Sequence, residues 1–160
     1  MAATATTATN PAPAVVAPSL LPGLTGVFAG SGVEAFSTPS LIEAILDLLP
    51  EEKKKNKEAG SYESINVLYI GTATYDLPVF RGKQTKCFAD LGCTVQSLDV
   101  AFDDDDDDGS SNAKESNESL IKNADVIVVS GGNTLYAVDR WNQLGLVPHL
   151  KRAAGRGCLM

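Results

Sequence analysis

The sequence predicts an α/β domain in which a parallel sheet lies between helices on both faces. Short segments of strand-forming residues alternate with segments whose apolar residues recur at helical spacing. Strands that alternate with helices are joined by crossovers, so neighbouring strands run parallel. Glycines end three of these strands, at Gly30, Gly71 and Gly131, and ligands of parallel sheets bind at that edge.

The first predicted strand is 26–30, and a helix follows it. Thr38 or Ser40 can cap this helix at its N-terminus. Pro50 ends the helix, and the charged segment 51–63 is expected to be a solvated connection. The apolar face of the helix consists of Leu41, Ile42, Ile45, Leu48 and Leu49.

A second strand is predicted at 65–70, and a helix opens near Asp76, which can serve as its cap. Gly92 suits the left-handed conformation that ends a helix, and a third strand follows at 94–98. The buried face of this helix would comprise Phe80, Cys87, Phe88 and Leu91.

The remaining elements alternate in the same way. They are, in order, an acidic solvated loop (103–117), a short helix (116–123), a strand (125–129), a helix that follows Gly132 and is closed by Gly145, and a last helix (148–154). Residues 158–160 resemble the opening of another strand, so we expect the domain to be incomplete at its C-terminus.

Length and composition fit one domain, 23–160, preceded by a tail. Residues 1–22 are mostly Ala, Thr and Pro, carry little to bury, and are expected to be flexible. A net charge of −7 argues against nucleic acid or an anionic membrane surface as a partner. No apolar run approaches the roughly 20 residues that cross a membrane.

The three cysteines favour a cytoplasmic location. They are odd in number and form no C-x-x-C pair, which is typical of reduced thiols. The first 52 residues contain no Lys or Arg, so neither a secretory signal nor a transit peptide is predicted.

The strand at 125–129 leads into a candidate ligand site, which consists of Gly131, Gly132, Asn133 and Thr134. Glycine lets the backbone approach a ligand closely, and the N-terminus of the following helix offers unpaired N–H groups to an anion. These residues are equally compatible with an ordinary tight turn. No cofactor or metal ion is expected.

Two other motifs have a simpler explanation than ligand binding. Gly30–Ala35 matches the dinucleotide fingerprint G-x-G-x-x-A, but the next strand lacks the acidic residue that would bind a ribose. Asp104–Glu115 matches a calcium-binding loop, but six consecutive aspartates satisfy that pattern almost by accident. We expect an acidic, solvated insertion there.

Four single residues are further site candidates. His149 is the only histidine and is expected on the surface of the last helix. Tyr75, Asp76 and Arg81 follow a strand and could face the cleft. A helix cap is the simpler role for Asp76, and a solvated side chain is the simpler state for Arg81.

Segments from residue 65 to 160 carry a family resemblance: 67–72, 88–95, 121–134, 144–148 and Arg156–Gly157. Through these segments the chain resembles peptidase E, the aspartyl dipeptidases of the S51 serine peptidase family. The resemblance implies a class I glutamine amidotransferase-like (flavodoxin-like) fold. It also implies hydrolysis of short peptides by a Ser/His/acid apparatus, with a preference for aspartate at the amino-terminal position.

The resemblance also distributes roles among the residues of the candidate site. It makes the N–H of Gly132 an oxyanion donor, lets Gly131 turn the backbone, and has Asn133 and Thr134 fix the loop. The family nucleophile lies in G-x-S-A-G-A after the next strand, with the histidine and the acid further downstream. We therefore expect all three beyond Met160, and no activity from the 160-residue chain alone.

Three functions stay open at this point. The first is a serine-type dipeptidase acting on small peptides. The second is a non-catalytic α/β binding protein, and the third is a nucleotide-binding domain that uses Gly30 and Gly32. No pattern in the sequence defines an oligomeric state.

Overall fold

A parallel sheet forms the centre of the computed structural model, which describes residues 24–53, 62–102 and 112–160. Its strands are β1 (Asn66–Ile70), β2 (Thr94–Leu98) and β3 (Val126–Val129), in the order β2-β1-β3. Both pairings are parallel. The predicted α/β architecture is therefore confirmed.

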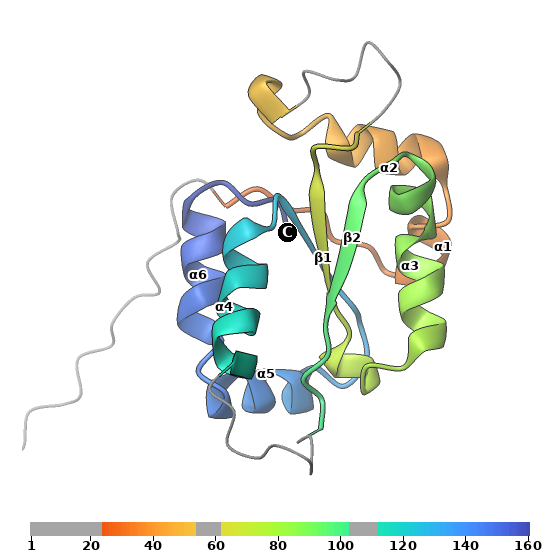
Figure 1. Ribbon diagram of the computed structural model, residues 1–160. Coiled ribbons are helices and arrows are strands. Elements are labelled where there is room, and N and C mark those ends of the chain that lie inside the picture. Colours follow the sequence, from red (N-terminus) through yellow and green to blue (C-terminus); the bar gives the residue numbers. More distant parts are fainter. Residues whose placement is uncertain (1–23, 54–61, 103–111) are drawn as a thin grey trace, which may run out of the picture.

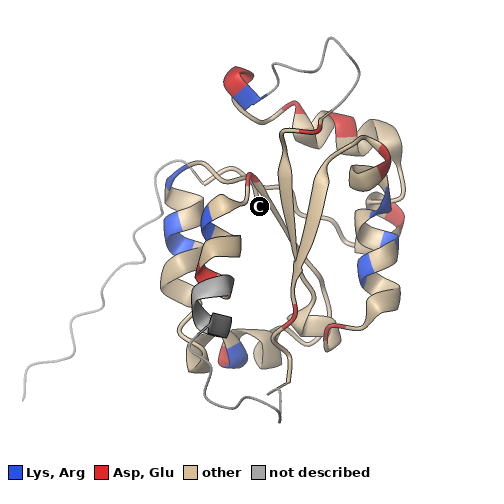
Figure 2. Ribbon diagram, viewed as in Figure 1, with Lys and Arg blue, Asp and Glu red and all other residues tan. Residues whose placement is uncertain are grey.

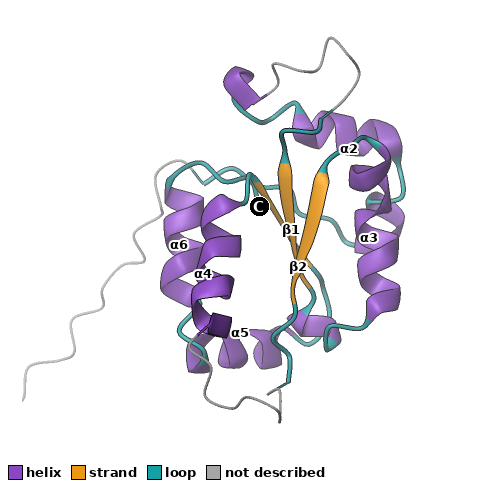
Figure 3. Ribbon diagram, in the orientation of Figure 1, coloured by secondary structure: helices purple, strands orange, loops and turns teal. Residues whose placement is uncertain are grey.

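Helices cover both faces of this sheet (Figure 1, Figure 3). On one side lie α2 and α3, and on the other lie α4 and α6, whereas α5 lies at the end where the strands stop. The helices are α1 (Gly32–Ala35), α2 (Pro39–Leu46), α3 (Pro78–Asp90), α4 (Asn112–Asn123), α5 (Thr134–Gln143) and α6 (Val147–Gly155). Two 3₁₀ turns are also described, η1 (Glu51–Lys53) and η3 (Thr72–Thr74).

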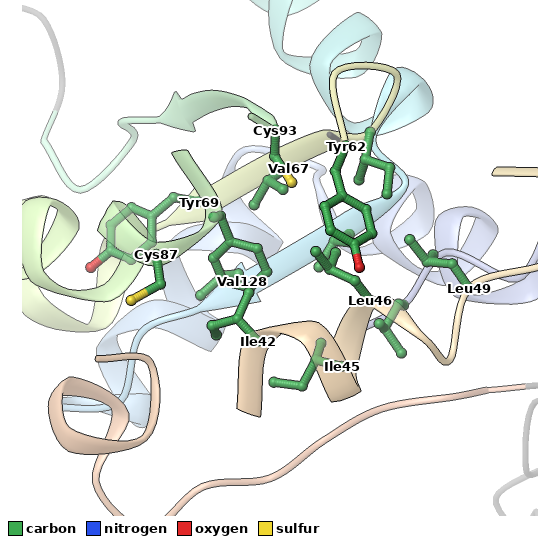
Figure 4. Close-up of a cluster of buried hydrophobic side chains, with 14 residues drawn as sticks. Ile42, Ile45, Leu46, Leu49, Tyr62, Val67, Tyr69, Cys87, Cys93 and Val128 are labelled. Carbon is green, nitrogen blue, oxygen red and sulfur yellow. The ribbon is translucent and has the colours of Figure 1, made fainter. Parts of the chain in front are cut away.

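The alternation of side chains along the strands divides the core into two halves. In β1, Val67 and Tyr69 face α2 and α3, whereas Leu68 and Ile70 face α4 and α6. Figure 4 shows the first half, in which side chains from β1 and β3 meet those of α2. None of the three strands carries a charged residue, and Figure 2 shows the charged residues on helices and loops.

The sheet continues beyond β3 through two short backbone segments. Leu159 forms a parallel bridge with Val126. Met160 then donates its N–H to Thr25 O at 3.1 Å and accepts the N–H of Val27 at 2.8 Å. Residues 158–160 thus extend the sheet, as predicted, but the predicted strand 26–30 does not form. Among the described residues, one pair of backbone hydrogen bonds, made by Thr25 and Val27, ties this segment to Met160, and a strand needs a longer series of such bonds.

The boundary between the predicted acidic loop and the next helix differs from the prediction. The helix before β3 begins at Asn112 rather than 116, so residues 112–117 of the predicted loop 103–117 are helical. The tail 1–22 and the aspartate run lie outside the described residues. No helix of the described segments is long and apolar enough to cross a membrane.

Glycines end two of the helices as predicted. Gly92 follows α3 with φ 90°, and Gly145 follows α5 with φ 68°. Both values lie in the left-handed region that favours glycine.

We predict that Phe88→Ala lowers the free energy of unfolding by about 3–5 kcal/mol, because it leaves a cavity beneath α3. Phe88 is 0% exposed and packs against β1 and α2. Phe28→Ala is the matched control, since Phe28 is 96% exposed. Urea unfolding of both variants tests this prediction, and equal losses would contradict it.

Candidate active site

The candidate site lies where two neighbouring strands end. β1 runs into the turn Gly71–Asp76, and β3 runs into Gly131–Thr134, which we call the GGNT loop. Because β1 and β3 are paired in parallel, these two segments meet at the same edge of the sheet. The α5 helix begins there, as Figure 1 shows.

Backbone and side-chain hydrogen bonds join the GGNT loop to the turn after β1. The N–H of Asn133 donates to Ala73 O at 2.8 Å. The hydroxyls of Thr74 and Ser130 lie 3.1 Å apart, and Ser130 also donates to Gly131 O at 2.9 Å. The GGNT loop therefore has a defined position relative to β1.

The close approach of the GGNT loop to the turn after β1 depends on Gly132. Its φ of 128° is a conformation that side chains rarely adopt. A Cβ atom at this position would lie 2.4 Å from Ala73 O. Gly131 differs in both respects, because its φ is not positive and a Cβ atom there would meet open space.

The two glycines leave backbone donors available. Among the hydrogen bonds between described residues, none uses the N–H of Gly131 or Gly132, and both residues are exposed. They precede the first turn of α5, where the helix dipole places partial positive charge. An anion or a polarised carbonyl oxygen would be stabilised there.

Asn133 caps α5 and also contacts the turn after β1. Its Oδ1 accepts the N–H of Tyr136 at 3.1 Å, and its Nδ2 donates to the hydroxyl of Tyr75 at 3.0 Å. Thr134 begins α5 and donates its N–H to Gly132 O at 3.0 Å. Further along α5, the indole N–H of Trp141 donates to Thr72 Oγ1 at 3.0 Å. Tertiary contacts thus fix both ends of this helix.

The predicted cap role of Asp76 is wrong. The N-cap of α3 is Leu77, and Asp76 has a positive φ of 53° outside the helix. Its Oδ2 accepts the N–H groups of Val100 and Ala101 at 2.6 and 2.5 Å. Sequence reasoning missed this role because the partners are 24 and 25 residues away.

Burial raises the pKa of Asp76 above its ordinary value of 3.8, although the two backbone N–H groups act in the opposite direction. Its Oδ1 is buried without a hydrogen-bond partner among the described residues. Arg81, the other candidate on this side, donates to Ser97 Oγ at 2.8 Å and to Asp99 at 2.9 Å. Arg81 therefore links α3 to the end of β2.

His149 lies on α6, a helix that packs beside α4. Its Nδ1 is 3.2 Å from Glu118 Oε1 and 2.8 Å from a nitrogen of Arg152. This agrees with the predicted surface position. Burial raises the pKa of both Cys93 and Cys158 to about 11, so neither thiol is a thiolate nucleophile at neutral pH.

A hollow of about 600 Å³ lies at the opposite edge of the sheet. Asn66, which begins β1, and Asp125, which precedes β3, line it together with Lys53. Lys53 pairs with Asp125 at 2.8 Å. Its lining residues lie at the amino edge of the sheet, whereas ligands of parallel sheets bind at the carboxyl edge. The hollow is therefore separate from the candidate site.

The two alternative motifs gain no support. The segment before Gly30 forms no strand, and α1 spans only four residues, so the strand–turn–helix context of a dinucleotide site is missing. Most of the calcium-loop motif lies outside the described residues. Within the described residues, no group of His, Cys, Asp and Glu could hold a metal ion.

Comparison with known proteins decides the family. The sequence profile of Peptidase family S51 matches residues 37–160. The chain belongs to this family. The match includes β1, β3 and the GGNT loop, and it also extends over α2.

Two further similarities cover shorter stretches. G2/mitotic-specific cyclin-1 of Trypanosoma brucei brucei is 37% identical over 76 residues, which is 48% of this chain and 22% of that protein. A crystal structure from Listeria monocytogenes EGD-e, provisionally assigned as peptidase E, is 20% identical with a TM-score of 0.48. That likeness covers 66% of this chain and 48% of the other. The chain thus spans less than half the length of either protein.

We predict that Gly132→Ala destabilises the fold by about 1–3 kcal/mol, because the methyl group meets Ala73 O and the backbone is strained. Gly131→Ala is the matched control and should change the free energy of unfolding by less than about 1 kcal/mol. Chemical denaturation measures both. Equal stability of the two variants would contradict the close approach.

A second prediction concerns pH. A raised pKa means that the folded state binds the proton of Asp76 more tightly than the unfolded state does. The resulting stabilisation is complete below 3.8 and is lost as the pH rises through the raised pKa. Relative to Asp76→Asn, wild-type protein should therefore become less stable over this range. Urea unfolding at a series of pH values measures the difference, and a difference that grows in favour of wild type as pH rises would contradict the prediction.

Proposed function

We propose that this chain forms part of a serine-type dipeptidase of the S51 family and supplies its oxyanion site. The observation that carries the proposal is the pair of N–H groups at Gly131 and Gly132, at the N-terminus of α5, which have no partner among the described residues. They lie at the sheet edge where ligands of such folds bind. In a peptidase family, the anion expected at that position is the oxygen of the attacked carbonyl.

The chemistry follows from where charge develops. When a serine oxygen attacks a peptide carbonyl, negative charge accumulates on the carbonyl oxygen. Donors already in place stabilise that charge without reorganisation, and one such donor contributes about 10²–10³ in rate. The N–H of Gly132 lies in the same peptide as Gly131 O, which accepts the Ser130 hydroxyl at 2.9 Å, and the next peptide is fixed by the Asn133 N–H on Ala73 O. The N–H of Gly132 therefore has a defined direction.

The proposed reaction takes its nucleophile and base from outside these 160 residues. Ser130 is 3% exposed, and its hydroxyl contacts Thr74 and Gly131, so it is not presented to a substrate. His149 contacts Glu118 and Arg152 on the α4–α6 side. Neither residue has the geometry of a nucleophile or its base.

The proposed substrate is a short peptide with an amino-terminal aspartate. The family resemblance supports this choice. Arg81 is not assigned to the substrate carboxylate, because it already contacts Ser97 and Asp99. No cofactor enters the proposed reaction, and the proposed setting is the cytoplasm.

Titration of the ¹⁵N-labelled chain with the dipeptide Asp-Leu tests the proposal. We expect the amide resonances of Gly131 and Gly132 to shift, because their N–H groups are the donors, while those of the α6 helix stay in place. Leu-Leu is the matched control ligand and should cause smaller shifts. Under the same conditions Asp-p-nitroanilide should not be hydrolysed.

Two results would contradict the proposal. Unmoved resonances of both glycines at millimolar Asp-Leu would remove the loop from the substrate site. Turnover of Asp-p-nitroanilide by the pure 160-residue chain would show that its nucleophile and base lie within these residues.

A further inference from the structure

The turn between β1 and α3 holds an unusual backbone conformation. Tyr75 has φ 55° and ψ 36°, and Asp76 has φ 53°. They are the described non-glycine residues with positive φ, and they are adjacent. A left-handed conformation is unfavourable for a side chain as large as that of tyrosine. Such conformations persist where the surroundings over-determine them.

Asp76 is one part of those surroundings. Its carboxylate accepts two backbone N–H groups, from Val100 and Ala101, in the loop after β2. A Cβ atom on Gly71 would lie 3.0 Å from Asp76 Oδ1, so the glycine leaves room for the carboxylate. The same loop is held from the other side, because Arg140 Nε donates to Val100 O at 2.8 Å and Tyr136 donates its hydroxyl to Ala101 O.

The consequence is a defined position for the Tyr75 side chain. Its ring stacks on Phe102 at a centroid distance of 6.2 Å and lies 4.9 Å from the ring of Tyr136. Its hydroxyl accepts the Nδ2 proton of Asn133 at 3.0 Å. The residue is 40% exposed, so burial of its ring is not sufficient to account for its place.

Capping of α5 does not require this hydrogen bond. Helix capping uses only the Oδ1 atom of Asn133, and serine or aspartate caps equally well. The Nδ2 donor contacts Tyr75 alone among the described residues. Because both ends of its amide are bonded, the side chain of Asn133 is fixed. Its backbone N–H, which donates to Ala73 O, fixes the Gly132–Asn133 peptide, and this peptide adjoins the one that carries the Gly132 N–H.

We propose that Tyr75 is a positioning residue, which sets the direction of the Gly132 N–H through its hydrogen bond to Asn133. Strain at Tyr75 and Asp76 is the cost of directing the phenol toward the GGNT loop. The catalytic meaning of this role rests on the proposed function, but the hydrogen-bond chain itself does not.

Amide hydrogen exchange and ¹⁵N–¹H spectra of Tyr75→Phe test the inference without a substrate. The variant keeps the ring and removes one hydroxyl. We expect the Asn133 amide, bonded to Ala73 O, to exchange about threefold to tenfold faster, the effect of losing one ordinary hydrogen bond. The Gly131 and Gly132 resonances should shift, and the melting temperature should fall by only a few degrees.

Tyr69→Phe is the matched control. Tyr69 lies in β1, and its buried hydroxyl has no partner among the described residues. Loss of that hydroxyl should leave the Asn133 exchange rate and the Gly132 resonance unchanged. A Tyr75→Phe protein with wild-type exchange at Asn133 and an unmoved Gly132 resonance would overturn the inference, as would equal effects of the two variants.

Asn133→Ser removes the same bond from its other end and keeps the cap. It should reproduce the effect of Tyr75→Phe, and the double variant should show no further change, because both remove one interaction. If Tyr75→Phe fails to fold, Asn133→Ser decides, and an unmoved Gly132 resonance in it overturns the inference. Failure of Asp-Leu to bind wild-type protein would count against the proposed function only.

Discussion

The contact on which the rest of the site depends is the approach of Gly132 to the carbonyl of Ala73. No side chain fits between the two segments, because a Cβ atom would come within 2.4 Å of that oxygen. The approach lets Asn133 donate its backbone N–H to Ala73. Within the described part of the chain, the N–H groups of both glycines have no partner, and they lie at the N-terminus of a helix. The tight turn and the candidate anion site are thus the same feature of the molecule.

Hydrogen bonds that involve the loop after β2 also hold this arrangement in place. Asp76 binds the backbone of the loop after β2, and Tyr136 and Arg140 of α5 bind the same loop. Tyr75 lies among these groups and contacts Asn133. The desolvated carboxylate and the left-handed residues are unfavourable locally, and they persist because the three segments that follow β1, β2 and β3 converge there. The left-handed residues Tyr75 and Asp76 and the raised pKa of Asp76 thus lie together at the carboxyl edge of the sheet.

The two edges of the sheet have different character. At the amino edge, Lys53 and Asp125 form an ion pair beside a polar hollow. At the carboxyl edge, aromatic rings and backbone groups surround the GGNT loop. Parallel strands make this division, because all of them begin at one edge and end at the other. Oriented backbone donors are therefore available at the carboxyl edge, where the proposed chemistry takes place.

The sequence by itself determined β1, β2 and β3, the helices that alternate with them and the position of the GGNT loop, because hydrophobic periodicity and glycine placement are local signals. Gly92 and Gly145 end their helices as predicted. Two local predictions were wrong. Residues 26–30 have strand-like composition but do not form a strand, and Asp76 precedes a helix but binds a distant loop. Only the tertiary structure decided the contact of Tyr75 with Asn133, since 58 residues separate them and no local pattern encodes which strand ends become neighbours.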